Sequence, residues 1–259
     1  MKRIITFLLA AIFLFSLAGC TLIPQKDALE LHEGVWDSEF TGLKLDVDVA
    51  KITVAPGDGF HVEYGLCNEP VIATADDGTL TIREKADDHW WDDIHFTQVI
   101  QPYVKVTVPE GTALGIVDVT VDVGDVEVSK LEIGALHVDA DVGDLTLQAI
   151  TVQGAVDLSA DVGNVDCREM AVTGAVTIDV DTGDIAFDGS AASVDADADV
   201  GNVKLVLPGT AADWAMELET DVGDITVDGM AQGDRYETRG GQFRLEADTD
   251  TGDVTVEFQ

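Results

Sequence analysis

Apolar and polar residues alternate along most of this chain, with the period of two that a half-buried β-strand requires. Residues 43–49 read Leu-Lys-Leu-Asp-Val-Asp-Val. Comparable strands are predicted at 60–64, 79–83 and 104–108, with turns between them at Pro56–Gly59 and Asp76–Gly78. No long stretch has helical spacing. The pattern therefore predicts an all-β protein.

From about residue 112 the strands form a repeat. The tetrapeptide Asp-(Val/Thr)-Gly-(Asp/Asn), followed by Val, Ile or Leu, occurs seven times, with glycines 19, 20, 20, 18, 22 and 29 residues apart. The copies are Asp122–Asp125, Asp141–Asp144, Asp161–Asn164, Asp181–Asp184, Asp199–Asn202, Asp221–Asp224 and Asp250–Asp253. A second, weaker glycine turn at Gly134, Gly154 and Gly174 lies about halfway between copies.

A period of about 20 residues with two short strands and two turns is typical of a β-solenoid, whose coils stack about 4.8 Å apart. We therefore predict a single-stranded β-helix, expected to be right-handed, with about seven coils over residues 111–259. Residues 41–110 are predicted to form an N-terminal β-strand region that continues or caps the solenoid. The longer spacing between Gly223 and Gly252 predicts an insertion that bulges out of the last coil and covers its exposed strand edges.

The residue types at the corners fit this geometry. Within Val138–Val142, the valines and the alanine are expected to face the core and both aspartates to face water. Glycine at each corner is expected to supply a positive φ, and the Asp or Asn after it is expected to bond the turn backbone.

The first twenty residues predict export. Lys2 and Arg3 precede an apolar run that is too short to span a bilayer but suits a secretory signal, and the run ends in Leu-Ala-Gly-Cys at Cys20. This end resembles the lipobox of bacterial lipoproteins, which implies a signal peptide at 1–19 and a diacylated Cys20. Two acyl chains suffice for stable membrane attachment. Polar residues 20–40 then suit a tether, and we expect an extracytoplasmic location at the cell membrane or outer membrane.

Composition narrows the choice of partners. The chain carries 14 Lys+Arg and 50 Asp+Glu, a net charge of −36, yet 46% of its residues are hydrophobic. Only six basic residues fall within 111–259. Nucleic acid is excluded as an expected partner, because binding it requires a basic face. The expected partners are the membrane, through the anchor, and an envelope protein or glycan.

Taken in order, several motifs resemble one known family. They are the lipobox, the hairpin at Pro56–Phe60, the strand at Asp77–Ile82, the Val-Thr-Val-Pro-Glu-Gly segment at 106–111, and the serial Gly-Asp corners. Together they resemble the bacterial putative adhesin family of domains of unknown function with β-strand repeats, over residues 40–259. The resemblance implies an exposed single-stranded β-helix on the cell envelope, with no agreed catalytic or binding residues to transfer.

The stacked corner carboxylates are a candidate calcium site. Carboxylates about 4.8 Å apart on successive coils lie roughly twice a Ca–O distance apart, so a cation can bridge them. The candidate ligands are Asp122, Asp125, Asp141, Asp144, Asp161, Asp181, Asp184, Asp221 and Asp224. The alternative is that these residues are solvated turn residues, and Asn164 and Asn202 favour it because they occupy the same corner without a charge. No other cofactor is expected.

Two further features stay open. The segment Asp87–His95 holds two histidines, two tryptophans and four aspartates, which suits a zinc site or a sugar platform, or alternatively a hairpin tip packed on the N-terminal strands. Cys67 and Cys167 form either a disulfide or, as we favour, two separate thiols.

Three function classes follow. The favoured one is a lipid-anchored, non-enzymatic surface binding or structural module, because repetition builds an extended surface. An accessory of an envelope-stress sensor is the alternative. A polysaccharide-acting enzyme is less favoured: the seven tetrapeptides contain no Arg or Lys to hold a uronate, and a hydrolase needs one carboxylate pair at a defined separation.

Overall fold

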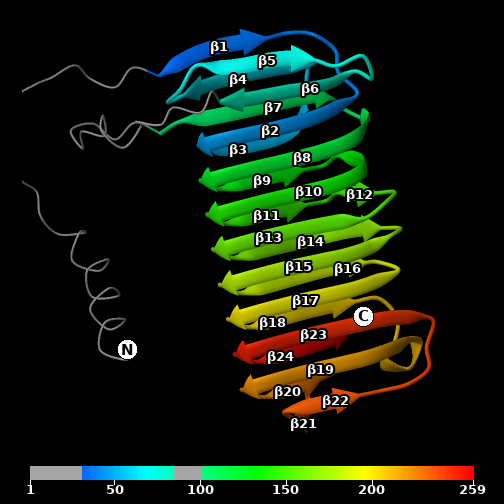
Figure 1. Cartoon of the computed structure of the whole chain (residues 1–259). Coiled ribbons are helices and arrows are strands. Elements are labelled where there is room, and N and C mark those ends of the chain that lie inside the picture. Colours follow the sequence, from blue (N-terminus) through cyan, green and yellow to red (C-terminus); the bar gives the residue numbers. More distant parts are fainter. Residues whose placement is uncertain (1–30, 85–100) are drawn as a thin grey trace, which may run out of the picture.

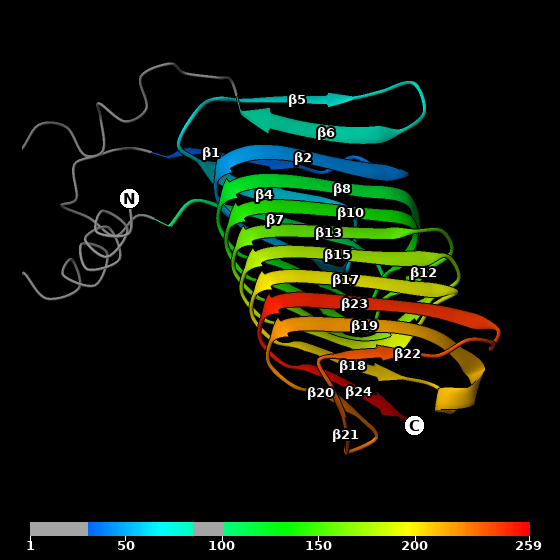
Figure 2. The ribbon, with the colours of Figure 1, turned by 60° about the horizontal axis from the view of Figure 1, so that its bottom comes forward.

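The computed structural model describes residues 31–84 and 101–259, which form a rod of stacked β-coils (Figure 1). Each coil has one strand in a front wall and one in a back wall, with the core between the walls (Figure 2). The predicted single-stranded β-helix is confirmed. The hand of its winding stays a prediction.

In stacking order the front wall contains β5 (Pro70–Thr74), β6 (Thr79–Glu84), β2 (Gly42–Val49), β8 (Ala113–Val123), β10 (Glu132–Val142), β13 (Val156–Val162), β15 (Ala175–Thr182), β17 (Ser193–Val200), β23 (Phe243–Thr251), β19 (Trp214–Val222) and β22 (Arg235–Glu237). The back wall contains β1 (His32–Trp36), β4 (His61–Leu66), β7 (Tyr103–Pro109), β3 (Lys51–Gly57), β9 (Val126–Ser129), β11 (Leu145–Gln148), β14 (Val165–Val172), β16 (Ile185–Ser190), β18 (Val203–Leu207), β24 (Val254–Phe258), β20 (Ile225–Val227) and β21 (Met230–Gly233). The short β12 (Thr151–Val152) pairs with β10 and β14.

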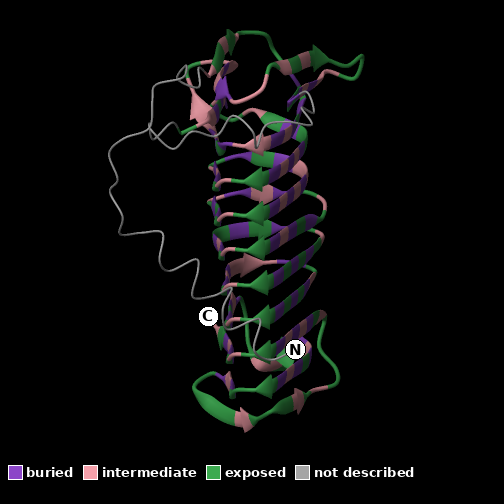
Figure 3. Cartoon of the chain, turned by 60° about the vertical axis from the view of Figure 1, so that its left-hand side comes forward, coloured by how far each residue is buried: buried purple, intermediate pink, exposed green. Residues whose placement is uncertain are grey.

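The alternation of residue types sets the two faces of each strand. Inward positions form columns of stacked apolar side chains, such as Val119, Val138, Leu158 and Ile178, each at most 1% exposed. Outward positions are polar, so buried and exposed residues alternate along every coil (Figure 3). The continuous core explains how a chain with this much charge still folds.

The coils do not stack in sequence order. The last coil along the chain, β23–β24, lies between β17–β18 and β19–β20 instead of beyond them (Figure 1). At the other end, β2–β3 lies between β6–β7 and β8–β9. Stacking therefore departs from sequence order at both ends of the rod.

Short antiparallel strands cover both ends of the rod. The insertion between Gly223 and Gly252 forms β21 and β22, which pair with β20 and β19, while β5 and β1 lie outermost at the other end. Short outer strands limit edge-to-edge association. β1 lies inside the segment 20–40 that was predicted as a tether, so part of that segment is a paired strand.

Positive φ and close stacking together explain the corner glycines. Gly143 has φ of 159°, a positive value that L side chains rarely adopt, so the predicted positive φ is confirmed there. A Cβ atom on Gly143 would also lie 2.1 Å from the carbonyl oxygen of Gly124 on the next coil. Only glycine lets the two backbones approach this closely.

Candidate functional site

The most prominent candidate site is the outward face of the front wall, which we call the acidic face. Three columns of residues run along it in register over eight coils. The first contains Asp48, Asp122, Asp141, Asp161, Asp181, Asp199, Asp250 and Asp221. The second contains Asp46, Thr120, Asp139, Ser159, Asp179, Asp197, Asp248 and Glu219. The third contains Lys44, Asp118, His137, Asp157, Thr177, Asp195, Glu246 and Glu217. Acids fill the whole first column and most of the other two.

Partial burial and crowding of carboxylates on the acidic face raise the pKa values of several of them. Partial burial, followed by repulsion from Asp248 and Asp179, raises the pKa of Asp197. Partial burial and neighbouring acids also raise the pKa values of Asp179 and Asp248. The acidic face therefore holds its charges at an electrostatic cost, which a cationic partner would reduce.

Cations from the chain itself reach only parts of this face. Lys44 pairs with Asp118 at 2.6 Å, and Arg235 reaches Glu217 at 3.1 Å and Glu219 at 2.6 Å. The ring of His137 lies 3.2 Å from Asp157. Within the part of the chain that the structure describes, no first-column aspartate forms an ion pair.

The fourth residue of each corner forms a separate column with a structural role. Six of these seven Asp or Asn side chains accept a hydrogen bond from the backbone N–H of the equivalent residue on the next coil, and Asp224, at the end, only donates its own N–H. For example, Asn164 N–H donates to Asp144 Oδ1 at 2.8 Å, and Asp184 N–H donates to Asn164 Oδ1 at 2.9 Å. The ladder runs through Asp125, Asp144, Asn164, Asp184, Asn202, Asp253 and Asp224.

The asparagines reduce the charge of this ladder. Asn164 donates a second hydrogen bond from Nδ2 to Asp144 Oδ1 at 3.0 Å, and Asn202 does the same to Asp184 at 2.9 Å. An amide group can accept from one coil and donate to another, which a carboxylate cannot do. The fourth position thus joins coils through hydrogen bonds.

The structure divides the candidate calcium ligands between these two columns. Asp122, Asp141, Asp161, Asp181 and Asp221 lie in the first column, with Asp250 between Asp199 and Asp221; Asp125, Asp144, Asp184 and Asp224 lie in the ladder. Across residues 31–84 and 101–259, no three His, Cys, Asp or Glu side chains are grouped so as to hold a metal. Calcium binding stays a prediction, and the ladder hydrogen bonds favour the structural alternative for the fourth position.

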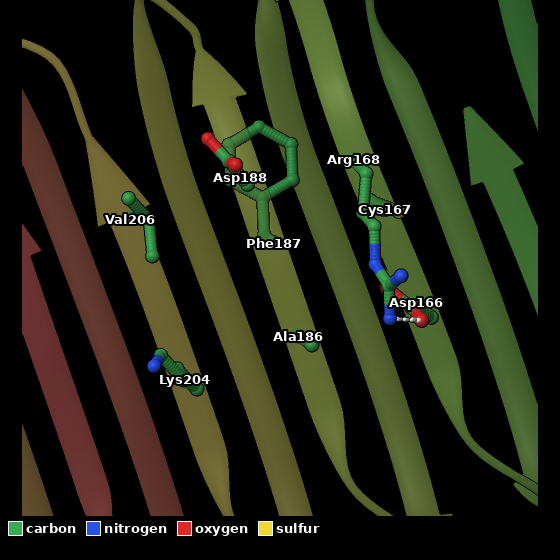
Figure 4. A pocket seen from close by; sticks show the side chains of 8 residues that line it. All are labelled: Asp166, Cys167, Arg168, Ala186, Phe187, Asp188, Lys204 and Val206. Atoms are coloured by element: carbon green, nitrogen blue, oxygen red, sulfur yellow. Dashed lines mark hydrogen bonds and ion pairs between the residues drawn. The ribbon is translucent and has the colours of Figure 1, made fainter. Parts of the chain in front are cut away.

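A shallow depression of about 250 Å³ lies on the back wall (Figure 4). Ala186, a small residue, lies in it among Asp166, Arg168, Asp188 and Lys204. Both acids are engaged: Arg168 Nε donates to Asp166 Oδ1 at 2.9 Å, and Gln259 Nε2 donates to Asp188 Oδ1 at 3.1 Å. Each of the two acids in this depression therefore already accepts a hydrogen bond.

A buried carboxylate fastens the N-terminal strands to the solenoid. Glu84 is 4% exposed and accepts the backbone N–H groups of Asp48 at 2.7 Å and Asn68 at 2.9 Å. Burial outweighs these two hydrogen bonds and raises the pKa of Glu84. The two bonds hold β6 against β2 and against the segment that follows β4, so Glu84 is structural.

The remaining sequence features are placed as follows. Cys67 and Cys167 are both free thiols, and burial raises the pKa of the Cys167 thiol. The lipobox with Cys20 and the segment Asp87–His95 lie outside the described residues. No helix within the described ranges is long and apolar enough to cross a membrane.

Sequence reasoning found the corner aspartates but missed the width of the acidic face. Asp46, Asp118 and Asp195 belong to it only because strands from distant parts of the chain align. The alternation within each strand showed that these residues face water. It could not show that they form continuous columns across the coils.

The chain matches the model of one known protein family. The family model described as Toastrack DUF4097 matches residues 40–258, which confirms the resemblance inferred from the sequence. No curated protein matches the chain.

Similar solved structures include two described as putative adhesins. One, from Bacteroides fragilis, has 16% identity and a TM-score of 0.45, covering 90% of this chain and 98% of that one. The other, from Parabacteroides distasonis, has 14% identity and a TM-score of 0.41, covering 89% and 97%. A putative cell adhesion protein from Clostridium sporogenes has 12% identity and a TM-score of 0.35, covering 89% and 100%. Likeness at this level says nothing about what this chain binds.

Proposed function

The chain belongs to the Toastrack DUF4097 family, and from that premise we propose that it is a lipid-anchored, non-enzymatic binding module of the bacterial cell envelope. The acidic face is the observation that carries the proposal. Its three columns continue in register over eight coils, so they offer an extended surface to a partner. Extended surfaces of this kind are what solenoid proteins use for binding.

The charge of this face indicates the partners. Many carboxylates in register attract cationic proteins and repel nucleic acid and anionic polymers. Attachment through Cys20 would hold the face outside the cytoplasm, where such partners are met. The proposed contacts are therefore the membrane, through two acyl chains, and an envelope protein or glycan, through the rod.

Absence of catalysis is part of the proposal. The acids of the depression are already bonded, and the acids of the face are repeated without a distinct pair. A purified chain incubated with a panel of glycans is expected to release no reducing ends. Release that a single Asp→Asn substitution abolishes would contradict the proposal.

Anchoring is tested by labelling with a fatty acid and fractionating cells. The wild-type chain is expected to carry the label and to sediment with membranes, whereas Cys20→Ser is expected to lose both properties. Cys67→Ser is the matched control, because Cys67 lies within the folded region and is expected to leave the label unchanged. Labelling that survives Cys20→Ser would overturn the anchor.

Binding through the acidic face is tested by capture from detergent-solubilised membranes. A variant with Asp→Asn at positions 141, 161, 181 and 199 removes four first-column charges and no hydrogen bond of the ladder. Capture of a specific partner by the wild type, lost in this variant but retained in Glu127→Gln on the back wall, is the expected result. Equal capture by all three proteins would contradict a role for this face.

A further inference from the structure

An exposed apolar line runs beside the first column of the acidic face. The second residue of each corner points outward, and in five of the seven corners it is valine. These residues form the valine line: Val123 is 43% exposed, Val142 45%, Val162 50%, Val200 50% and Val222 65%. Thr182, Thr251 and the half-buried Val49 lie in the same column.

The fold does not require valine at these positions. Thr182 and Thr251 pair in register with Val200, so threonine fits the same extended corner. Threonine keeps the branched Cβ that favours extended backbone and replaces a methyl group with a hydroxyl. Because threonine fits the same corners, the fold does not require the exposed methyl groups, and a line of them along one face is the kind of feature that marks an interaction surface.

Carboxylates flank the valine line along its whole length on one side. A first-column aspartate precedes each valine by one residue, and the ladder residue two positions after it is Asp in three cases and Asn, at Asn164 and Asn202, in two. Within the described residues, no Lys or Arg is paired with the first-column aspartates. A partner that complements this surface needs an apolar stripe with cations beside it, above all on the side of the first column.

The spacing of the coils selects a helix as the shape of that partner. Seven coils about 4.8 Å apart span about 29 Å, which an α-helix of about 19 residues matches in length. One helical turn rises 5.4 Å, so side chains of a parallel helix drift from the coils by only about 0.6 Å per turn. An extended strand repeats a given face every ~6.8 Å, so its side chains lose register with the coils after a single repeat.

We propose that the valine line and its flanking aspartates form a docking surface for a cationic amphipathic α-helix of a partner. The helix lies along the rod, its apolar stripe covers the valines, and its Lys or Arg side chains reach the aspartates. The proposal rests on the proposed function only for the statement that this face meets partners outside the cytoplasm.

The test uses a synthetic 18-residue Leu/Lys peptide whose leucines lie on one helical face. A peptide of the same composition with leucines distributed on all faces, and an 18-residue oligolysine, are the control peptides. The protein is the Cys20→Ser chain released from cells, which carries no acyl groups and needs no detergent. Calorimetry and fluorescence anisotropy measure the affinity.

The decisive variant converts all five residues of the valine line to threonine. Because the chain already has threonine at two equivalent corners, this variant is expected to keep the wild-type circular dichroism spectrum. Its affinity for the amphipathic peptide is expected to fall at least about tenfold, through loss of apolar contact. Its affinity for oligolysine is expected to stay unchanged. A control with Val35→Thr and Val71→Thr, which are exposed positions on β1 and β5 outside the valine line, is expected to bind like the wild type.

Two results would overturn the proposal: equal affinity of the amphipathic peptide for the wild type and the five-fold variant, or binding of oligolysine as tight as that of the amphipathic peptide. Both outcomes are independent of anchoring. Failure of the docking surface leaves the fatty-acid labelling of Cys20 unaffected, and failure of the labelling leaves peptide binding unaffected.

Discussion

Removing one charge from the acidic face should stabilise the rod. Asp197 lies in the second column between Asp179 and Asp248, each on an adjacent coil. Two unit charges about 4.8 Å apart repel by about 0.9 kcal/mol at the dielectric of water. Screening at physiological salt, where the Debye length is about 8 Å, reduces each repulsion to about 0.5 kcal/mol. Asp197→Asn removes two of them, so we expect a gain of about 1 kcal/mol.

The assay is thermal and urea denaturation followed by circular dichroism at two salt concentrations. A gain of this size corresponds to a rise of about 2–4 °C in melting temperature for a protein of this length. In 1 M NaCl the Debye length falls to about 3 Å, so the gain should shrink to about 0.3 kcal/mol. Salt dependence separates electrostatic relief from a change in packing.

The matched control is Asp166→Asn on the back wall. Asp166 is also a strand aspartate that faces outward, but Arg168 donates two hydrogen bonds to it. Losing this exposed pair should lower stability by about 0.2–1 kcal/mol. The reasoning is refuted if Asp197→Asn melts below the wild type, or if its gain is the same at both salt concentrations.

Four further predictions follow from the same contacts. The pKa values of Asp122, Asp179, Asp195, Asp197 and Asp248 are raised above 3.8 in the folded state, so these groups bind protons more tightly when folded. Their contribution to stability is lost as the pH rises from 3.8 through the folded values, so Asp197→Asn, which cannot ionise, should gain stability relative to the wild type over this rise in pH; a constant difference between the two would contradict the assignment. Gly163→Ala would place Cβ 1.9 Å from the oxygen of Gly143 and should cost about 3 kcal/mol or more in urea denaturation, whereas Gly59→Ala, with nothing within 4 Å, should cost less than about 0.5 kcal/mol. Glu84→Gln replaces one of two buried acceptors with a donor and should cost about 1–3 kcal/mol, although it removes a charge as Asp197→Asn does; an increase in stability would show that relief of the buried charge outweighs the loss of one acceptor. Millimolar Ca²⁺ and Mg²⁺ at equal ionic strength should raise the melting temperature equally, because no three acids in the described part of the chain form a ligand set. A rise in melting temperature that is specific to Ca²⁺ would instead support bridging of neighbouring coils by calcium.

The sequence predicted the local structure well because each position carries its own signal. The strand that contains Asp139 and Asp141 alternates so clearly that their exposure follows from the period alone. The same alternation was wrong for Val142, which was expected in the core and is 45% exposed, because the period of two ends at the corner. Corner positions were equally clear, although the reason for glycine was only partly foreseen. A stacking clash depends on the next coil, which a local pattern does not contain.

The order of the coils was not predictable in the same way. All repeats share one register, so the pattern fits any order of stacking equally well. A signal does exist in two buried threonines, Thr220 and Thr249, at an inward position where neighbouring coils carry valine or alanine. The Thr249 hydroxyl donates to Gly201 O and the Thr220 hydroxyl to Gly252 O, both at 2.9 Å. These hydrogen bonds join coil β23–β24, which is inserted between β17–β18 and β19–β20, to its neighbours on each side.

The position of coil β23–β24, inserted between β17–β18 and β19–β20, also explains how the acidic face stays in register up to the end of the rod. The terminal coil β19–β20 is connected both to β18 and, through β21 and β22, to β23, so its separation from the rod would disturb the chain on both sides. Trp214 of β19, 1% exposed, packs against Phe243 of β23 with ring centroids 5.0 Å apart. Because both connections and this aromatic contact oppose fraying, the outermost acids, Asp221 and Glu219, keep the alignment of the central ones. A ligand that spans many coils needs this alignment along its whole length.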